Sequence, residues 1–375
     1  MNEGISIQIR SEVTNEGKLK LSLIEEKKPT PKENEVLIRV EATPINPSDL
    51  GLLLGPADVN SLKVEGHKEN IVAMIDIPEP LMRMVQPRLG KSLPVGNEGA
   101  GVIEDAGENA KDLIGKVVGV AGGAMYSQYR CVPASSCLIM NEGTSPSEAA
   151  SCFVNPLTTL GMVETMKSEG HKGLVHTAAA SNLGQMLVKV CKMDGVPLVN
   201  IVRTADQEDK LRSLGAEFVC NSSNEDFMTS LVEALVASES TLAFDAIGGG
   251  KLSGQVLTAM EIAANKNSAE HSIYGSTTYK QVYIYGGLDR SPTTLNRAYG
   301  MSWGIGGWLL TPFIGKIGPD KFQALRKRVS DEIKTTFVSN YSKEISLQEA
   351  LHEESILDYS KQATGKKYLI TPHKE

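Results

Sequence analysis

The sequence predicts an α/β protein in which a mainly-β region precedes a doubly wound parallel sheet. In the first 133 residues, short apolar runs are separated by turns rich in Gly and Pro, which is typical of an all-β region. Residues 35–42, EVLIRVEA, alternate apolar and polar side chains as a half-exposed strand does. From about residue 146 onward, strand-like and helix-like runs alternate. This alternation predicts parallel strands that are joined by crossover helices.

Composition and charge limit the functions that the chain can have. Of its 375 residues, 41% are hydrophobic and 22% charged, as in soluble domains, and the length suffices for two or three of them. The net charge of −7 offers no basic surface to nucleic acid, and no apolar run approaches the ~20 residues that cross a bilayer. Residues 1–10 lack the plan of a signal peptide, and the five cysteines are scattered without a C-x-x-C pair. We therefore expect a cytoplasmic protein with reduced thiols and with neither nucleic-acid nor membrane partners.

Residues 56–93 interrupt the mainly-β region with a loop and a helical run, PEPLMRMVQPRLG. A surface insertion is one interpretation of this segment. A lid or wall over a pocket is the other, because long insertions often carry function.

Caps, turn residues and apolar runs predict the helices and strands of the α/β part. Ser145 before Pro146 predicts a helix cap and first turn. The run GLVHTAAA then predicts a buried strand, and the helix after it buries one face. Further strands are expected in PLVNIV, TLAFDAIGG, QVYIYGGLD and KKYLITP, with a helix in TADQEDKLRSLGA.

The turn between the first strand and its helix is a candidate phosphate-binding site. A helix N-terminus offers free N–H groups and the positive end of a dipole, so a phosphate can bind there without a full set of glycines. Small residues at 178–181 let the backbone approach a ligand closely, and Gly195 with Pro197 ends the helix. An ordinary strand–turn–helix is the alternative. The candidate cofactor-binding residues are Ala180, Ser181, Asn182, Leu183 and Gly184.

The next strand indicates which cofactor would bind. In dinucleotide-binding folds an acid about 20 residues past the turn binds the ribose hydroxyl, whereas an arginine accommodates a 2′-phosphate. Here the strand VNIV is followed by Arg203 and Thr204. An arginine at this place favours NADPH over NADH. The competing interpretation of Arg203 is a solvated surface residue. Two later strand ends carry glycines where ligands of open α/β sheets bind. They add the candidates Ile247, Gly248, Tyr285, Gly286 and Gly287.

Taken together, the motifs resemble those of the medium-chain dehydrogenase/reductase superfamily, and most of all its zinc-independent quinone oxidoreductase and enoyl reductase branch. The resemblance rests on EVLIRVEATPINPSD, PVGNEGAGVIEDAG, SQYRCVPAS, NPLTTLGMVE, HTAAASNLGQML, LRSLGAEFV, FDAIGG, YGGLD and ATGKKYLI. It implies a GroES-like catalytic domain, formed by both chain ends, around an inserted Rossmann domain. The domains expected are residues 1–150 (GroES-like, with the 56–93 insertion), 151–300 (Rossmann) and 301–375 (returning to the catalytic domain).

The chain departs from the family pattern at several positions. The family turn is often A-x-x-G-x-x-G, and here Ala178, Ser181 and Gly184 occupy its three fixed places. Zinc alcohol dehydrogenases have a cysteine at the place of Asn46 and a histidine at the place of Asn97. Residues 50–130 hold no cysteine, and the six histidines form no ligand pair, so we expect no metal.

The resemblance implies hydride transfer from NADPH to a quinone-like acceptor. Reduction of an activated C=C bond, in an enone, enal or enoyl thioester, is the alternative. Asn46 and Thr158 match family positions that line the nicotinamide pocket, where each could hydrogen-bond an acceptor carbonyl or the ribose. Enoyl thioester reductases use a tyrosine shortly after the NPSD-type motif, which this chain lacks, and Tyr126 is a candidate substitute donor. The competing interpretations are a turn former for Asn46, a packed helix residue for Thr158 and a packed strand aromatic for Tyr126.

Two further expectations concern partners. Trp303 and Trp308 lie in an apolar, Gly-rich stretch that can be a core or interface segment, or a flat wall for an aromatic acceptor. The resemblance implies a homo-oligomer, and we expect a homodimer. A non-catalytic role also stays open, because some relatives are lens crystallins or RNA-binding proteins that still hold NADPH.

Overall fold

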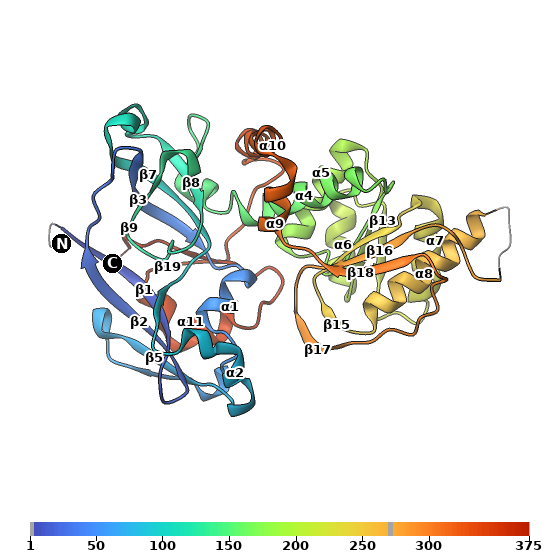
Figure 1. Ribbon diagram of the computed structural model, residues 1–375, viewed down its shortest axis with the longest axis horizontal. Coiled ribbons are helices and arrows are strands. Elements are labelled where there is room, and N and C mark those ends of the chain that lie inside the picture. The colour runs from blue at the N-terminus through green and yellow to red at the C-terminus, as the bar shows by residue number, and fades with distance from the viewer. Residues whose placement is uncertain (1–3, 269–272, 375) are drawn as a thin grey trace. The chain divides into compact units, whose positions relative to one another are not determined.

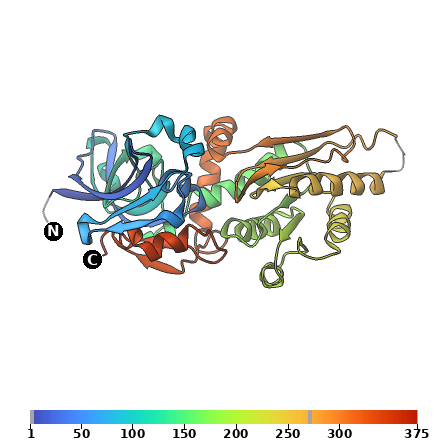
Figure 2. The ribbon, with the colours of Figure 1, turned by 90° about the horizontal axis from the view of Figure 1, so that it is seen from below.

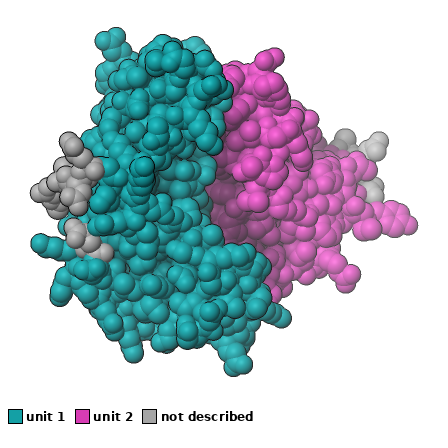
Figure 3. All heavy atoms as spheres, turned by 60° about the vertical axis from the view of Figure 1, so that its left-hand side comes forward, with its two compact units in different colours: residues 1–154, 326–375 teal, residues 155–325 magenta. Residues whose placement is uncertain are grey.

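The computed structural model describes residues 4–268 and 273–374, so that His271 lies outside the described residues. Contacts divide the chain into two compact units, Met1–Val154 with Arg326–Glu375 (unit 1) and Asn155–Leu325 (unit 2). Figure 1 traces the chain and Figure 3 colours the two units. The domain boundaries at 150 and 300 stay predictions.

Unit 1 is built from two mainly antiparallel sheets. The order of the first is β4 (Lys63–Glu65), β5 (Val72–Asp76), β2 (Lys18–Lys27), β1 (Ile5–Val13), β6 (Ser92–Pro94). The order of the second is β10 (Leu138–Ile139), β8 (Val117–Ala121), β7 (Glu98–Ala106), β3 (Glu35–Pro44), β20 (Tyr368–Ile370), β19 (Lys343–Ile345), and β9 (Tyr129–Pro133) also pairs with β3.

The two ends of the chain meet in the second sheet. β20, the strand expected in KKYLITP, pairs antiparallel with β3, with Leu369 opposite Pro44 and Ile370 opposite Thr43. The C-terminal strands thereby complete a sheet that the N-terminal region begins. The helices of unit 1 are α1 (Leu50–Leu53), α2 (Met82–Val85), α3 (Pro146–Ala149) and α11 (Glu353–Tyr359).

The segment 56–93 is part of this framework. β5 pairs antiparallel with β2, and the side chains of Ala73 and Ile75 on β5 are fully buried. The helical run that we expect here is α2, a single turn between 3₁₀ turns. The segment therefore contributes a strand and core side chains, which a purely surface insertion would not do.

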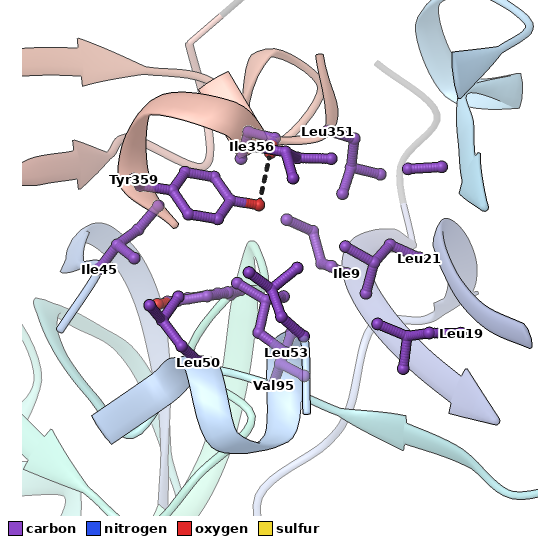
Figure 4. Packing of buried hydrophobic residues seen from close by; sticks show 14 of the residues in the cluster. Ile9, Leu19, Leu21, Ile45, Leu50, Leu53, Val95, Leu351, Ile356 and Tyr359 are labelled. Carbon is purple, nitrogen blue, oxygen red and sulfur yellow. Dashed lines mark hydrogen bonds between the residues drawn. The ribbon is translucent and has the colours of Figure 1, made fainter. Parts of the chain in front are cut away.

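One hydrophobic cluster joins elements that are far apart in the sequence of unit 1. Ile9 and Leu21 come from the first two strands, Leu53 from α1 and Ile356 from α11. Figure 4 shows these side chains converging, with the Tyr359 hydroxyl donating to the carbonyl of Ala350 at 3.2 Å. Fully burying one such aliphatic side chain stabilises the fold by roughly 1.5–3 kcal/mol, so the C-terminal return is fixed by packing as well as by strand pairing.

Unit 2 is a six-stranded parallel sheet with helices on both faces (Figure 2). Numbered along the chain, its spatial order is 3-2-1-4-5-6, that of doubly wound dinucleotide-binding folds. The order reverses between the first and fourth strands, and ligands of such sheets bind beside that reversal. The strands are β13 (Phe218–Asn221), β12 (Leu198–Val202), β11 (Leu174–His176), β14 (Leu242–Asp245), β16 (Lys280–Ile284) and β18 (Trp303–Gly307).

The helices of unit 2 follow the expected alternation. The cap and first turn predicted at Ser145 and Pro146 form the single turn α3, and four residues separate it from α4. No helix among residues 4–268 and 273–374 is both long and apolar enough to span a membrane. The helices are α4 (Val154–Ser168), α5 (Asn182–Asp194), α6 (Ala205–Ser213), α7 (Phe227–Ser238), α8 (Leu252–Asn267), α9 (Leu310–Ile317) and α10 (Pro319–Glu332), the last crossing into unit 1, and a small sheet pairs β15 (Gly248–Gly250) with β17 (Asp289–Thr293).

Helix α5 shows why the sequence folds as predicted around the phosphate-binding turn. Ser181 is its N-cap, and its hydroxyl oxygen accepts a hydrogen bond from Gly184 N at 3.2 Å. The helix ends at Gly195, whose φ of 65° lies in the left-handed region that glycine adopts without strain. A side chain at position 184 would collide with the carbonyl oxygen of Ala179, so glycine is what lets the helix approach the turn.

We predict that Gly184→Ala destabilises unit 2, because the added Cβ has no space beside Ala179. Overpacking of this kind costs ~1–3 kcal/mol. Gly315→Ala on α9 is the matched control, since no atom lies within 4 Å of its Cβ and alanine favours helices by up to ~1 kcal/mol. Denaturant unfolding of both variants is the measurement, and equal stabilities of the two would contradict the prediction.

Candidate active site

A buried hydrogen-bond network holds the strand ends of unit 2 at the reversal of strand order. Asp245, at the end of β14, is 1% exposed, and its Oδ1 accepts from the Thr177 hydroxyl at 2.7 Å and from Ile247 N at 2.8 Å. Its Oδ2 accepts from the Ser253 hydroxyl at 2.6 Å. Thr177 follows β11 and also accepts from Ala246 N at 2.8 Å. Neighbouring strands on either side of the reversal are therefore tied together at their carboxyl ends.

The predicted phosphate-binding turn lies directly after Thr177. Ala178 has a φ of 49°, which turns the chain sharply, and Ala179 N donates to the carbonyl of Ile201 on β12 at 3.2 Å. Ala180 and Leu183 are buried, and Asn182 is the first residue of α5. The turn carries only small side chains in front of a helix N-terminus. This arrangement fits a pyrophosphate, because backbone N–H groups and the helix dipole attract anions there.

The two candidates after β12 have different surroundings. Arg203 is exposed, and among the described residues its guanidinium has no hydrogen-bond or ion-pair partner. The backbone of Arg203 is held, because its N–H donates to Gln207 at 3.0 Å and its carbonyl accepts from Ser223 at 2.8 Å. Thr204 is the N-cap of α6 and accepts from Gln207 N at 3.3 Å. An anchored backbone with a free guanidinium suits the recognition of a phosphate group.

The later strand ends also bring their predicted residues to this edge of the sheet. Gly248 adopts a φ of 79°, and Ile247 holds Asp245 as described above. A Cβ on Gly286 would lie 2.6 Å from the carbonyl oxygen of Ala246, whereas one on Gly287 would meet nothing within 4 Å. Glycine at 286 therefore allows the β14 and β16 ends to approach each other.

A buried histidine accompanies Tyr285. The Nε2 of His176, on β11, is 2.7 Å from the Tyr285 hydroxyl. Burial lowers the pKa of His176 to about 3, so its imidazole is neutral at physiological pH. Its Nδ1 is buried and has no hydrogen-bond partner among the described residues.

Unit 1 contains a second polar cluster, around Asn46. Asn46 is 1% exposed and directly precedes the 3₁₀ turn Pro47–Asp49. Its backbone N–H donates to Asp49 Oδ2 at 2.7 Å, and Asn97 N donates to Asp49 Oδ1 at 2.7 Å. The Asn46 Nδ2 donates to Glu98 Oε1 at 2.7 Å. Asn46 is therefore both a turn former and a member of a buried polar network.

Glu98 is fully buried at the start of β7 and is surrounded by donors. Its Oε2 accepts from the backbone N–H groups of Phe153 at 2.8 Å and Val154 at 2.9 Å. Burial raises the pKa of Glu98, whereas the positive charge of Lys367 and the hydrogen-bond donors lower it. Lys367 itself donates to the Ser151 hydroxyl at 2.7 Å, and burial lowers its pKa to about 8.

The remaining two catalytic candidates, Tyr126 and Thr158, are both buried. Tyr126 packs in the hydrophobic cluster of unit 1, and its hydroxyl donates to the carbonyl of Pro44 at 3.1 Å. Burial raises the pKa of this phenol well above its usual value. Thr158 is 6% exposed on α4. The packed-aromatic interpretation accounts for the surroundings of Tyr126, and the catalytic roles of both residues stay predictions.

The two tryptophans also have defined surroundings within unit 2. Trp308 donates from Nε1 to the Thr165 hydroxyl at 3.1 Å and packs against Phe244 and Phe313. Trp303 packs edge-to-face on the buried Tyr299. Both indoles therefore contribute to packing.

The residues at the centre of these networks were not among the predicted site residues: Thr177, Asp245, Asp49 and Glu98. Two of them had a signal in the sequence, since Asp245 ends an apolar strand and Glu98 begins one, in GNEGAG. A charged residue inside an apolar run is seldom buried without partners. Within the described ranges, no three His, Cys, Asp or Glu side chains gather as a metal-binding group.

Comparison with known proteins finds similar sequences among reductases. No family model matches the chain. It is 25% identical over 277 residues to the mitochondrial enoyl-[acyl-carrier-protein] reductase of Xenopus tropicalis, covering 71% of this chain and 65% of the relative. It is 24% identical over 276 residues to an NADPH quinone oxidoreductase of Kluyveromyces marxianus, covering 70% and 64%. The matched region thus spans somewhat less than two thirds of the length of these relatives.

The fold is shared over the full length with a solved structure. The quinone oxidoreductase of Escherichia coli, determined in complex with NADPH, superposes with a TM-score of 0.69 at 20% identity. The superposition covers 98% of this chain and 100% of the other. The architecture of a mainly-β domain and a parallel-sheet domain is therefore confirmed.

We predict that Asp49 makes stability depend on pH. Burial and the nearby Glu98 raise its pKa to about 7, against ~3.9 in an unfolded chain. The folded state therefore binds an extra proton between these values, and the contribution of Asp49 to stability, full below pH ~4, is lost as the pH rises through 7.

Asp49→Asn removes this titration. Urea unfolding of both proteins from pH 5 to 7.5 should show that the free energy of unfolding of the wild type, relative to the variant, decreases toward the higher pH. Asp49 also helps to raise the pKa of Lys367, but that pKa, about 8, lies above the measured window. Parallel profiles for the two proteins would contradict the prediction.

Proposed function

We propose that this chain, which has the fold of the medium-chain dehydrogenase/reductase superfamily and homologues among its NADPH quinone oxidoreductases and enoyl reductases, transfers hydride from NADPH to a quinone-like acceptor. The observation that carries the proposal is the turn at the reversal of the parallel sheet. There small side chains precede a capped helix N-terminus, and the next strand is followed directly by an exposed arginine whose guanidinium has no partner among the described residues.

The residues of unit 2 have distinct tasks in this proposal. The α5 N-terminus, at residues 180–184, holds the pyrophosphate, and Arg203 binds the 2′-phosphate that distinguishes NADPH from NADH. Ile247, Gly248 and the 285–287 turn form further parts of the nucleotide site. When bound, the nicotinamide supplies the hydride, and the protein orients the reactants and excludes water.

The chemistry of the donor set supports a reaction without zinc. Zinc requires thiolate, imidazole or carboxylate ligands. Asn46 and Asn97 are carboxamides, and their Nδ2 groups donate to Glu98 at 2.7 Å and to Ser48 at 3.1 Å. Each amide is used in a hydrogen bond that holds the protein together. Hydride transfer to a quinone needs no metal, because a solvent proton can complete the reduction.

Reduction of an activated C=C bond is the second candidate, and the enoyl-[acyl-carrier-protein] reductase relatives favour it. Against it, the candidate substitute for the expected tyrosine donor, Tyr126, is buried with its hydroxyl donating to Pro44. Quinone reduction therefore leads.

Assembly and location belong to the same proposal. We expect a homodimer in the cytoplasm. The five cysteines, all free thiols, suit a reducing compartment. β18 is an edge strand of the parallel sheet, so its outer backbone groups are available to pair with a second copy.

We predict that Arg203→Gln weakens NADPH binding by about 10-fold or more and leaves NADH binding unchanged, because a charge-assisted hydrogen bond contributes ~1.5–3 kcal/mol. Nucleotide fluorescence titration measures both affinities. Lys116→Gln changes the charge equally at an exposed site in unit 1 and serves as control. Equal losses of affinity for NADPH and NADH would contradict the assignment of Arg203 to the 2′-phosphate.

We predict NADPH oxidation with 1,4-benzoquinone at a kcat/KM that exceeds that with a crotonyl thioester. The reason is the buried hydroxyl of Tyr126, which leaves the thioester without the expected proton donor. NADPH absorbance with each acceptor is the measurement. Faster thioester turnover would establish the C=C alternative, and tight NADPH binding without turnover of either would support the non-catalytic role.

A further inference from the structure

Unit 1 contains a cavity of about 220 Å³ that has no part in the proposed function. Strand β1, the end of β2 and strand β9 contribute polar residues to its lining. The lining residues that the structure describes all belong to unit 1, whereas the candidate nucleotide-binding residues belong to unit 2. Pockets for drug-sized ligands measure ~300–1,000 Å³, so this cavity suits a smaller molecule.

The alternation of side chains along β1 makes one wall of the cavity polar. Ile7 and Ile9 pack in the hydrophobic cluster of unit 1, and residues two apart in a strand share a face. Ser6, Gln8 and Arg10 therefore lie on the opposite face of β1, and all three line the cavity. Ser6 is only 4% exposed, yet its hydroxyl has no hydrogen-bond partner among the described residues. This wall thus has unused hydrogen-bonding capacity.

Arg130, on β9, brings an uncompensated positive charge to the cavity. It is half-buried, and its guanidinium has no hydrogen-bond or ion-pair partner in the described part of the chain. Its Nε is buried and unpartnered there as well. Burial lowers the pKa of Arg130, but a guanidinium remains charged at physiological pH. A partly buried charge without a counter-ion destabilises a protein, so Arg130 lacks an anion.

The other charged residues of the lining do not supply this anion. Arg10, Lys27 and Arg130 are positive, and Glu26 is the one carboxylate among the described lining residues, which leaves a local charge of +2. Glu26 already forms an ion pair with Arg10. The whole chain carries a net charge of −7, so this positive cluster is a local exception. A phosphate monoester carries about −1.5 to −2 at pH 7 and has three strong acceptor oxygens, which matches the cluster.

We propose that this cavity is a binding site for a small phosphate compound, either a phosphate monoester or the free ion. Arg130 and Lys27 bind the phosphate oxygens, because a guanidinium offers a planar fork of donors and an ammonium a compact charge. The hydroxyl of Ser6 and the amide of Gln8 provide further donors from β1.

Apolar residues complete the lining. Pro29, Pro94 and Ala124 line the same cavity, and they can contact a short organic group that is attached to the phosphate. These contacts favour a monoester over the free ion. The site lies within unit 1 and does not depend on the proposed hydride transfer.

Isothermal titration calorimetry of the full chain with phenyl phosphate and with inorganic phosphate tests the proposal. A phosphate-free buffer of constant ionic strength is used for both. We expect saturable binding by the wild type, and tighter binding of phenyl phosphate. Arg130→Gln should weaken the affinity at least ~10-fold, because it removes charge-assisted hydrogen bonds to the phosphate. Arg83→Gln removes an exposed arginine of α2, outside the cavity lining, and should leave the affinity unchanged.

Thermal unfolding separates loss of the site from loss of the fold. Without ligand, Arg130→Gln should have a Tm equal to or above that of the wild type, because it removes an uncompensated charge. Phenyl phosphate should raise the Tm of the wild type and not that of Arg130→Gln. Lys27→Gln, at an exposed position of β2, should weaken binding by up to ~5-fold, and it tests the site even if Arg130→Gln does not fold.

Two results overturn the proposal. One is a wild type that binds neither compound, or an Arg130→Gln variant that binds as tightly as the wild type. The other is phosphate binding that Arg203→Gln abolishes and Arg130→Gln preserves, because the anion then occupies the nucleotide site of unit 2. Where binding requires Arg130, the tighter of the two compounds identifies the monoester or the free ion as the ligand. If the wild type binds phosphate through Arg130 but binds no NADPH, the proposed function fails and this inference stands.

Discussion

The buried carboxylate of Asp245 is the interaction on which the nucleotide-binding half depends. It accepts from Thr177 after β11, from Ser253 on α8 and from the backbone at Ile247. A buried charge is tolerated only when its acceptor sites are filled, so these donors are held in place as firmly as the carboxylate itself. This network therefore also positions the turn that follows Thr177 and the N-terminus of α5.

Unit 1 repeats the same arrangement with Glu98. Here too a fully buried carboxylate is surrounded by donors, and one of them is a side chain that matches a family site position. In both units a buried carboxyl group accepts several hydrogen bonds, and a candidate site residue is its neighbour.

Close backbone approach is the other recurring constraint. Position 184 must be glycine for α5 to reach the turn, and position 286 must be glycine for the β16 end to pass Ala246. Both positions lie at strand or helix ends that face the candidate cofactor site. The 56–93 segment is constrained differently, because the side chains of Ala73 and Ile75 on β5 are buried in the core of unit 1.

The sequence by itself determined the fold class, the strand, turn and helix that begin in GLVHTAAA, and the strand that precedes Arg203, because periodicity and helix-ending residues are local signals. It also carried enough motifs to indicate the superfamily. It could not show that Asn46 donates to Glu98, that Asp245 accepts from Thr177 and Ser253, or that the Tyr126 hydroxyl donates to Pro44. These partners are 52, 68, 8 and 82 residues apart and meet only when the sheets form. Hydrogen-bond direction and burial are properties of the assembled core, so only the tertiary structure decided which polar atoms are used internally and which remain for a ligand.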